Sequence, residues 1–194
     1  MLTLIGIPTA STVEPETLKA IYGQAEADTE TALDILYGYR IDVQRRLLCE
    51  EAQRIGADYV LMVDSDVVLP ETALADLLDP PANIVTGYYR LKGPRRKGDI
   101  ASVWSGKWLT PEEMPEGRFK ITNSGAGCLM IRTSVLDRIP KPWFDFHETE
   151  DGRFIQEDTW FCQQALKAGI TIYADKRVAC GHIIKEQYAF GEGF

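Results

Sequence analysis

A run of five apolar residues, 59–63, leads directly into two carboxylates, Asp64 and Asp66, that flank Ser65. A short apolar run of this kind is typical of a buried strand, and the end of a strand can bend so that neighbouring side chains converge. Paired carboxylates are hard oxygen ligands for Mg²⁺ or Mn²⁺, which usually share their coordination shell with substrate phosphates. Because open α/β sheets bind ligands at the carboxyl ends of their strands, this turn predicts a metal-assisted nucleotide site.

Size and charge restrict the classes of protein that fit. A chain of 194 residues can bury one good core and is expected to form one domain. The net charge of -8 disfavours nucleic-acid binding, which usually requires a basic surface. An acidic protein that binds an acidic nucleotide needs a metal ion or a local basic patch to offset the repulsion between them.

Cysteine spacing and hydropathy indicate a cytoplasmic protein. The four cysteines, at positions 49, 128, 162 and 180, form no CxxC pair, so buried reduced thiols are expected. No apolar stretch approaches the length of about 18 residues that a membrane span requires, so no transmembrane segment is expected. The first residues read as a strand without a basic leader, so a signal peptide is not expected either.

The hydrophobic pattern predicts strands and helices that alternate along the chain. Strands are expected over 2–7, 32–37, 59–63, 84–89, 101–104, 119–122, 128–131, 170–173 and 178–180. Helices are expected over 15–22, from Asp42 as a cap to residue 55, from residue 70 to about 78, and over 134–139 and 159–168. This order implies an α/β fold with a mostly parallel sheet, helices on both faces and a partly antiparallel second half.

A second pair of acidic residues, Glu157 and Asp158, stands at the start of the last expected helix. Acidic side chains favour a helix N-terminus for electrostatic reasons alone. The functional alternative is a carboxylate that accepts a proton from a sugar hydroxyl as the hydroxyl attacks. Trp160 follows within two residues, and its indole either holds the face of a sugar or packs in the core.

Three further features have both a structural and a functional interpretation. His182 follows Gly181 at the end of a strand, where an imidazole can bind a metal or lie on the surface. Residues 125–127, Gly-Ala-Gly, permit close approach to a ligand, but a strand follows, so they are not a dinucleotide fingerprint. The basic residues of 92–97 form either a lid over phosphates or a solvated loop.

The order of these motifs resembles that of the GT-A-fold glycosyltransferases, in particular the large family-2-like group, over nearly the whole chain. The motifs that carry the resemblance are 7–9, Arg45 and Arg46, 63–67, 125–131, 156–162 and 180–182. The resemblance implies one domain with a nucleotide-binding half, 1–90, and an acceptor and catalytic half, 91–194. The chain is short for this group, so its acceptor region is minimal or completed by another subunit, as in a homo-oligomer.

The resemblance also implies roles for individual residues. Asp66 would be the direct ligand of Mn²⁺ or Mg²⁺, Asp64 would lie near the ribose or the metal, and His182 would be a further ligand. Arg45 would help to fix the nucleotide-sugar donor. The loop that meets the nucleotide corresponds to Pro8, Thr9 and Ala10.

On the acceptor side, Asp158 matches the base of the inverting members of the group. Gly125, Ala126 and Gly127 lie where acceptor and transferred sugar meet. Residues 32–37 are not followed by a clear acidic partner for a nucleobase, which leaves the base of the donor open between UDP and GDP.

The expected function is therefore metal-dependent transfer of a sugar from a UDP- or GDP-sugar to a hydroxyl of a glycan, lipid-linked or protein acceptor. A nucleotidyltransferase is one alternative, but it would show a Gly-rich basic loop after the first strand, where residues 8–12 read Pro-Thr-Ala-Ser-Thr. A non-catalytic nucleotide-sugar binding protein on the same fold is the other alternative.

Overall fold

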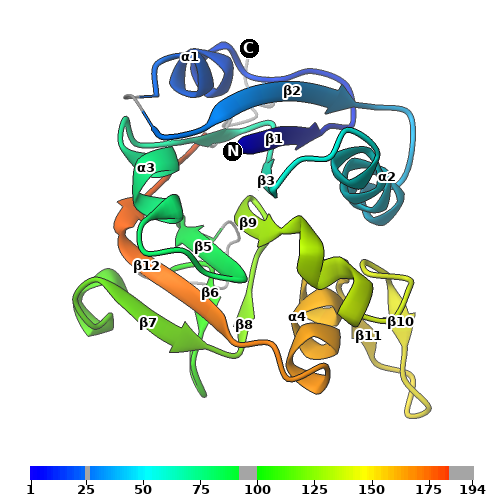
Figure 1. Ribbon diagram of the computed structural model, residues 1–194. Coiled ribbons are helices and arrows are strands. Elements are labelled where there is room, and N and C mark those ends of the chain that lie inside the picture. The colour runs from blue at the N-terminus through cyan, green and yellow to red at the C-terminus, as the bar shows by residue number, and fades with distance from the viewer. Residues whose placement is uncertain (25–26, 92–99, 184–194) are drawn as a thin grey trace, which may run out of the picture.

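The computed structural model describes residues 1–24, 27–91 and 100–183, and a seven-stranded sheet runs through its centre (Figure 1). The strand order is β2-β1-β3-β9-β5-β12-β7. The bounds are β2 Glu30–Leu36, β1 Leu2–Pro8, β3 Tyr59–Val63, β9 Cys128–Arg132, β5 Ile84–Tyr88, β12 Ile172–Ala179 and β7 Arg118–Ile121. Only β9 and β7 run against the direction of the other strands, which confirms the predicted mostly parallel sheet.

Helices cover both faces of this sheet. They are α1 Pro15–Tyr22, α2 Ile41–Arg54, α3 Ala73–Leu78 and α4 Glu157–Lys167, with 3-10 turns at Pro111–Glu113 and Thr133–Arg138. One apolar cluster joins the sheet to α2 and α4, and a second joins it to α1 and α3. Side chains of β3 alternate between the two clusters, with Val60 and Met62 in the first and Leu61 and Val63 in the second. Burial on both faces explains why this strand reads as a continuous apolar run.

Three small antiparallel sheets complete the described fold. Strand β4, Val67–Val68, pairs with β13, Gly181–His182; β6, Val103–Trp104, pairs with β8, Asn123–Ser124; β10, His147–Glu148, pairs with β11, Phe154–Ile155. They confirm the partly antiparallel character predicted for the second half. Figure 1 shows the β10–β11 hairpin beside α4.

Two local predictions were wrong at buried aspartates, in addition to shifts of a few residues at the ends of other elements. Helix α2 begins at Ile41 after Arg40, so Asp42 lies inside its first turn and does not cap it. The Asp42 carboxylate is buried and accepts hydrogen bonds of 2.6 and 2.8 Å from Arg40, and these lower its pKa although burial opposes the shift. The two strands expected over 170–180 are the single strand β12. The polar residues at the centre of β12 suggested a break between two strands. Asp175 is nevertheless buried there, because its Oδ2 lies 3.2 Å from Arg118 Nε and 2.7 Å from Arg177 Nη2.

The strand directions bring several chain segments to one edge of the sheet. The carboxyl ends of β1, β3, β5 and β12 lie there, and β9, which runs the other way, begins there just after Gly127. All four cysteines are free; three of them are buried, as predicted, whereas Cys180 is only half-buried. Among the helices within the described residues, none is long and apolar enough to cross a membrane.

Candidate active site

A cleft of about 430 Å³ opens at this edge of the sheet. It is lined by Pro8, Thr9, Ala10, Tyr39, Ile41, Gln44, Arg45, Asp64, Ser65, Asp66, Phe146, Gln156 and Glu157. The loop after β1, the turn after β3 and the start of α4 thus face one another, although they are far apart in the sequence. The cleft brings together the residues predicted for the nucleotide, the carboxylate turn and one member of the acidic pair.

The guanidinium of Arg45 joins three of the predicted motifs. It donates to Asp64 Oδ1 at 2.8 Å, to the carbonyl oxygen of Ala126 at 3.0 Å and to Glu157 Oε1 at 3.4 Å. Its side chain is only 3% exposed. Burial disfavours its charge, but the carboxylates of Asp64 and Glu157 outweigh this effect, so the pKa of Arg45 is raised and the cation persists. A single buried cation therefore fixes the carboxylate turn, the Gly-Ala-Gly turn and the start of α4 relative to one another.

The two acidic residues at the start of α4 ionise less readily than exposed carboxylates. Burial raises the pKa of Glu157 and of Asp158, and the nearby Arg45 cation offsets part of each shift. Asp158 Oδ1 accepts a hydrogen bond of 2.6 Å from the backbone N–H of Thr159. A carboxylate whose pKa is raised holds a proton more readily, which suits a general base.

His182 reaches the carboxylate turn through backbone pairing. Strand β13 lies antiparallel to β4, opposite Val67, and the N–H of Ile183 donates to the carbonyl oxygen of Asp66 at 2.9 Å. His182 Nδ1 lies 2.6 Å from the carbonyl oxygen of Arg90, which can only accept, so Nδ1 is the donor. In the neutral ring Nε2 then carries the lone pair, and it lies 3.5 Å from Asp66 Oδ1.

The two carboxylates of the turn thus have different partners. Asp64 binds Arg45, whereas Asp66 lies beside His182. Within residues 1–24, 27–91 and 100–183, no three His, Cys, Asp or Glu side chains gather closely enough to hold a metal ion by themselves.

Two residues of this site were missed by the sequence analysis. Tyr89 is 6% exposed, its hydroxyl oxygen accepts the N–H of Gly127 at 3.1 Å, and its ring centroid lies 5.0 Å from that of His182. Burial, and then the charges of Asp64 and Asp158, raise its pKa. Tyr89 follows β5 directly, as Asp64 follows β3. This position at the end of a strand is the feature of the sequence that could have identified Tyr89 as a site residue.

Gln44 is the second missed residue. Its side chain accepts the N–H of Thr9 at 2.7 Å and donates to the carbonyl oxygen of Thr9 at 3.1 Å. These bonds fix the loop after β1 against α2. Nothing in the helical pattern distinguished Gln44 from other polar residues of α2.

The Gly-Ala-Gly turn is shaped by its neighbours in the site. A Cβ atom on Gly125 would lie 2.2 Å from the Tyr89 hydroxyl oxygen. A Cβ atom on Gly127 would lie 2.8 Å from Asp64 Oδ2 and 2.9 Å from the Tyr89 ring. The glycines are therefore required because Tyr89 and Asp64 occupy the space of a side chain.

These contacts predict that Tyr89→Phe reduces the destabilisation caused by Gly125→Ala more than that caused by Gly127→Ala. Gly125→Ala and Gly127→Ala should each lower the free energy of unfolding by about 1–3 kcal/mol through overpacking. In a Tyr89→Phe background Gly125→Ala should cost less, because the clashing oxygen is gone, whereas Gly127→Ala should still meet the ring and Asp64. Urea unfolding of the single and double variants measures this; equal rescue of both glycine variants would contradict it.

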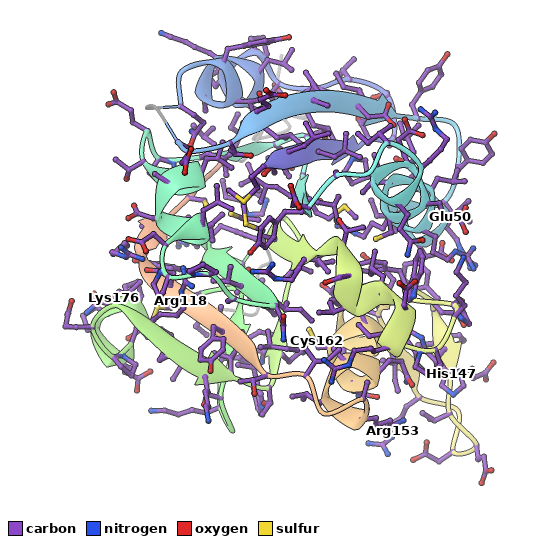
Figure 2. The ribbon with its side chains drawn as sticks, viewed as in Figure 1. Glu50, Arg118, His147, Arg153, Cys162 and Lys176 are labelled. Atoms are coloured by element: carbon purple, nitrogen blue, oxygen red, sulfur yellow. The ribbon has the colours of Figure 1, made fainter. Side chains whose placement is uncertain are left out.

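Some predicted residues lie beside the cleft and do not line it. Trp160 donates its indole N–H to the carbonyl oxygen of Pro142 at 3.0 Å, and its ring centroid lies 4.4 Å from that of His147, at the base of the β10–β11 hairpin (Figure 2). Its role in binding a substrate stays a prediction. The basic segment 92–97 lies outside the described residues.

Solved structures provide the comparison that decides the fold. A197 from STIV superimposes with a TM-score of 0.70 at 23% identity, over 95% of this chain and 87% of that one. GalNAc-T7 with UDP, GalNAc and Mn²⁺ gives 0.64 at 10% identity, over 95% of this chain and 44% of that one. TarS residues 1–349 from S. aureus with UDP-GlcNAc gives 0.59 at 15% identity, over 98% of this chain and 62% of that one.

The chain has the fold of the GT-A glycosyltransferases. This confirms the fold that the order of motifs predicted. No protein-family model matches the chain, and no curated protein matches it either. At identities of 10 to 23%, the GT-A likeness establishes the architecture.

Proposed function

We propose that this GT-A protein is a metal-dependent glycosyltransferase that moves a sugar from a UDP- or GDP-sugar to a hydroxyl acceptor with inversion. The observation that supports this best is the cleft in which Arg45 holds Asp64 of the carboxylate turn beside Glu157 of the acidic pair. Residues 1–90 would form the nucleotide-binding half, with Pro8, Thr9 and Ala10 along the nucleotide. Residues 91–194 would form the acceptor half.

The side chains of Asp66, in the cleft, and of His182, beside Asp66, fit a divalent metal such as Mn²⁺ or Mg²⁺. Asp66 would supply a carboxylate oxygen and His182 would supply the Nε2 lone pair. Oxygens of a bound diphosphate would occupy further positions of the coordination shell. When bound, the ion would offset the negative charge that develops on the nucleoside diphosphate leaving group. Arg45 would position Asp64, which would face the ribose or the metal.

The acidic pair supplies the base of the reaction. The acceptor hydroxyl oxygen bonds to the anomeric carbon while the bond from that carbon to the diphosphate oxygen breaks, and the hydroxyl proton passes to the Asp158 carboxylate. Attack on the face opposite the leaving group inverts the configuration. Glu157, held by Arg45, would fix the start of α4 so that Asp158 faces the acceptor.

Thermal unfolding with nucleotides tests the donor half of the proposal. UDP, GDP and their sugar conjugates are each added with Mn²⁺, with Mg²⁺ and with EDTA. A ligand at 100 times its Kd should stabilise the native state by about 2.7 kcal/mol. We expect a metal-dependent shift with one nucleotide family. Asp66→Ala should abolish this shift, and the matched control Glu71→Ala, an exposed residue outside the cleft, should retain it.

Product analysis separates the alternatives. Slow metal-dependent release of the nucleoside diphosphate supports a transferase, when the substrate is the sugar nucleotide that raises the unfolding temperature. Release of pyrophosphate from a nucleoside triphosphate and a sugar phosphate would indicate a nucleotidyltransferase. A thermal shift without any turnover would indicate a binding protein, and no shift with any nucleotide would overturn the proposal.

A further inference from the structure

Strand β2, Glu30–Leu36, is an edge strand of the seven-stranded sheet (Figure 1). Among the described strands it pairs only with β1. The N–H of its first residue and the carbonyl oxygen of its last residue both bond to residues that adjoin β1, so its even-numbered residues direct their backbone groups toward β1. Because successive residues of a strand alternate in this direction, three residues direct their N–H and C=O groups away from the sheet: Thr31, Leu33 and Ile35.

The sequence of β2 lacks the features that usually protect an exposed sheet edge. Natural edge strands are often very short, or carry lysine or proline, and these features disfavour pairing with another chain. The strand at the opposite edge, β7, has four residues and carries the exposed Lys120. Strand β2 has seven residues and contains neither lysine nor proline. It is therefore well suited to pair with a further strand.

Apolar side chains are exposed beside this edge, on the face of the sheet that α1 covers. Leu33 is 36% exposed, Ile35 is 38% exposed, and Tyr22 at the end of α1 is 79% exposed. The register places Leu33 beside Ile5 and Ile35 beside Ile7, and both partners are buried in the apolar cluster that includes α1. Leu33 and Tyr22 also line a cavity of about 350 Å³. A partner at this edge would cover apolar side chains as well as pair with the backbone.

We propose that β2 pairs antiparallel with β2 of a second copy of this chain, about a two-fold axis at Leu33. A two-fold axis perpendicular to the sheet makes identical edge strands antiparallel and joins the two sheets into one. With Leu33 opposite itself, Thr31 faces Ile35, because these residues are equally distant from the axis. Each of these pairs exchanges two hydrogen bonds, so every outward N–H and C=O group of the strand finds a partner.

The charges of β2 favour this register over its neighbours. With the axis at Leu33, Asp34 faces Ala32 and Glu30 faces Leu36, so no two acidic side chains are directly opposed. An axis at Asp34 would set the two copies of this carboxylate opposite each other. An axis at Ala32 would set Glu30 opposite Asp34. Like charges directly opposite are destabilising, so the strand is complementary to itself about its central residue.

The same register joins the apolar faces of the two copies. Directly opposed residues lie on the same face of a sheet, so Leu33 would contact its own counterpart. The second copy's Ile35 would stand opposite Thr31, which lines the cavity beside Tyr22. The dimer does not depend on the proposed transfer reaction, because the described residues that line the cleft include none from β2.

Light scattering after size-exclusion chromatography, over about 1 to 100 μM protein, tests the inference. We expect the mass to rise with concentration from the 21.8 kDa of one chain to twice that value and to stop there, because a two-fold contact is closed. Leu33→Lys should raise the dissociation constant of the dimer about tenfold or more, since it sets two like charges opposite each other. Leu33→Glu should have the same effect.

Mixing these two variants tests the register itself. The introduced lysine and glutamate would stand opposite each other about the axis, so the mixture should form a heterodimer at concentrations where each variant by itself is monomeric. Leu166→Lys provides the matched control, because Leu166 is 37% exposed and lies on α4. This control should dimerise as the wild type does. A mixture of folded variants that forms no heterodimer would overturn the pairing about Leu33.

Hydrogen exchange at single residues reports the pairing directly. The N–H groups of Thr31 and Ile35 should be protected in the dimer and exchange faster on dilution or in Leu33→Lys. The N–H groups of Ala32 and Asp34, which face β1, should stay protected in both states and so show that the variant is folded. A wild type that is monomeric at the highest concentration, a dimer that Leu33→Lys leaves unchanged, or a mass that rises beyond two chains would overturn the inference.

Discussion

Replacing Arg45 by methionine should lower the free energy of unfolding by about 3–5 kcal/mol, because it leaves partly buried carboxylates without their cation. Glu157 is 9% exposed and Asp64 28% exposed at their side chains, and both lose the same partner. The carbonyl oxygen of Ala126 loses its hydrogen bond as well. Urea unfolding monitored by circular dichroism measures the loss.

A neighbouring arginine provides the matched control. Arg46 lies on the same helix, is 32% exposed and reaches Asp42 at 3.6 Å. Arg46→Met should therefore cost no more than about 1 kcal/mol, because this arginine is partly exposed and the buried Asp42 keeps its two hydrogen bonds from Arg40. Adding Glu157→Gln to Arg45→Met should recover part of the loss, because one unpaired charge is removed. Equal costs for the two arginine variants would show that Arg45 does not hold the site together.

The comparison of these two arginines also shows where sequence reasoning ends. Both precede the carboxylate strand, and only the resemblance assigned a role to Arg45 in particular. The residues that Arg45 contacts are 19, 81 and 112 positions away. Only the packing of α2 against the sheet decides which arginine faces the cleft. Local patterns predicted the helix; they could not predict the direction of one side chain.

The elements that were predicted well share a strong local signal. Strand β3 is apolar throughout because both of its faces are buried, and α1 has the predicted bounds of Pro15–Tyr22, with proline in its first turn. Strand β12 was divided because Asp175 resembles a turn residue, and only the distant Arg118 explains its burial. Tyr89 was missed because its contact in the site is with Gly127, which is brought close by the pairing of β9 with β5.

Replacing Asp158 by asparagine should lower kcat for sugar transfer by about 10²- to 10⁴-fold, the usual contribution of a positioned general base. Metal-dependent binding of the nucleotide should persist, because Asp158 does not line the cleft in which we propose that the donor binds. The base acts only when it is deprotonated. Since burial raises the pKa of Asp158, kcat of the wild type should fall as the pH decreases through a value above that of an exposed aspartate.

The pH profile then distinguishes Asp158 from its neighbour. Asp158→Asn should remove this fall in kcat at acidic pH (the acidic limb of the profile), and the residual rate should not change with pH over the same range. Glu157→Gln should keep the limb, because Glu157 is assigned to holding the start of α4 through Arg45, although burial raises the pKa of Glu157 too. A limb that disappears in Glu157→Gln and persists in Asp158→Asn would transfer the role of base to Glu157. This exchange is the sharpest test of the acidic pair, because each side chain keeps its shape and loses only its charge.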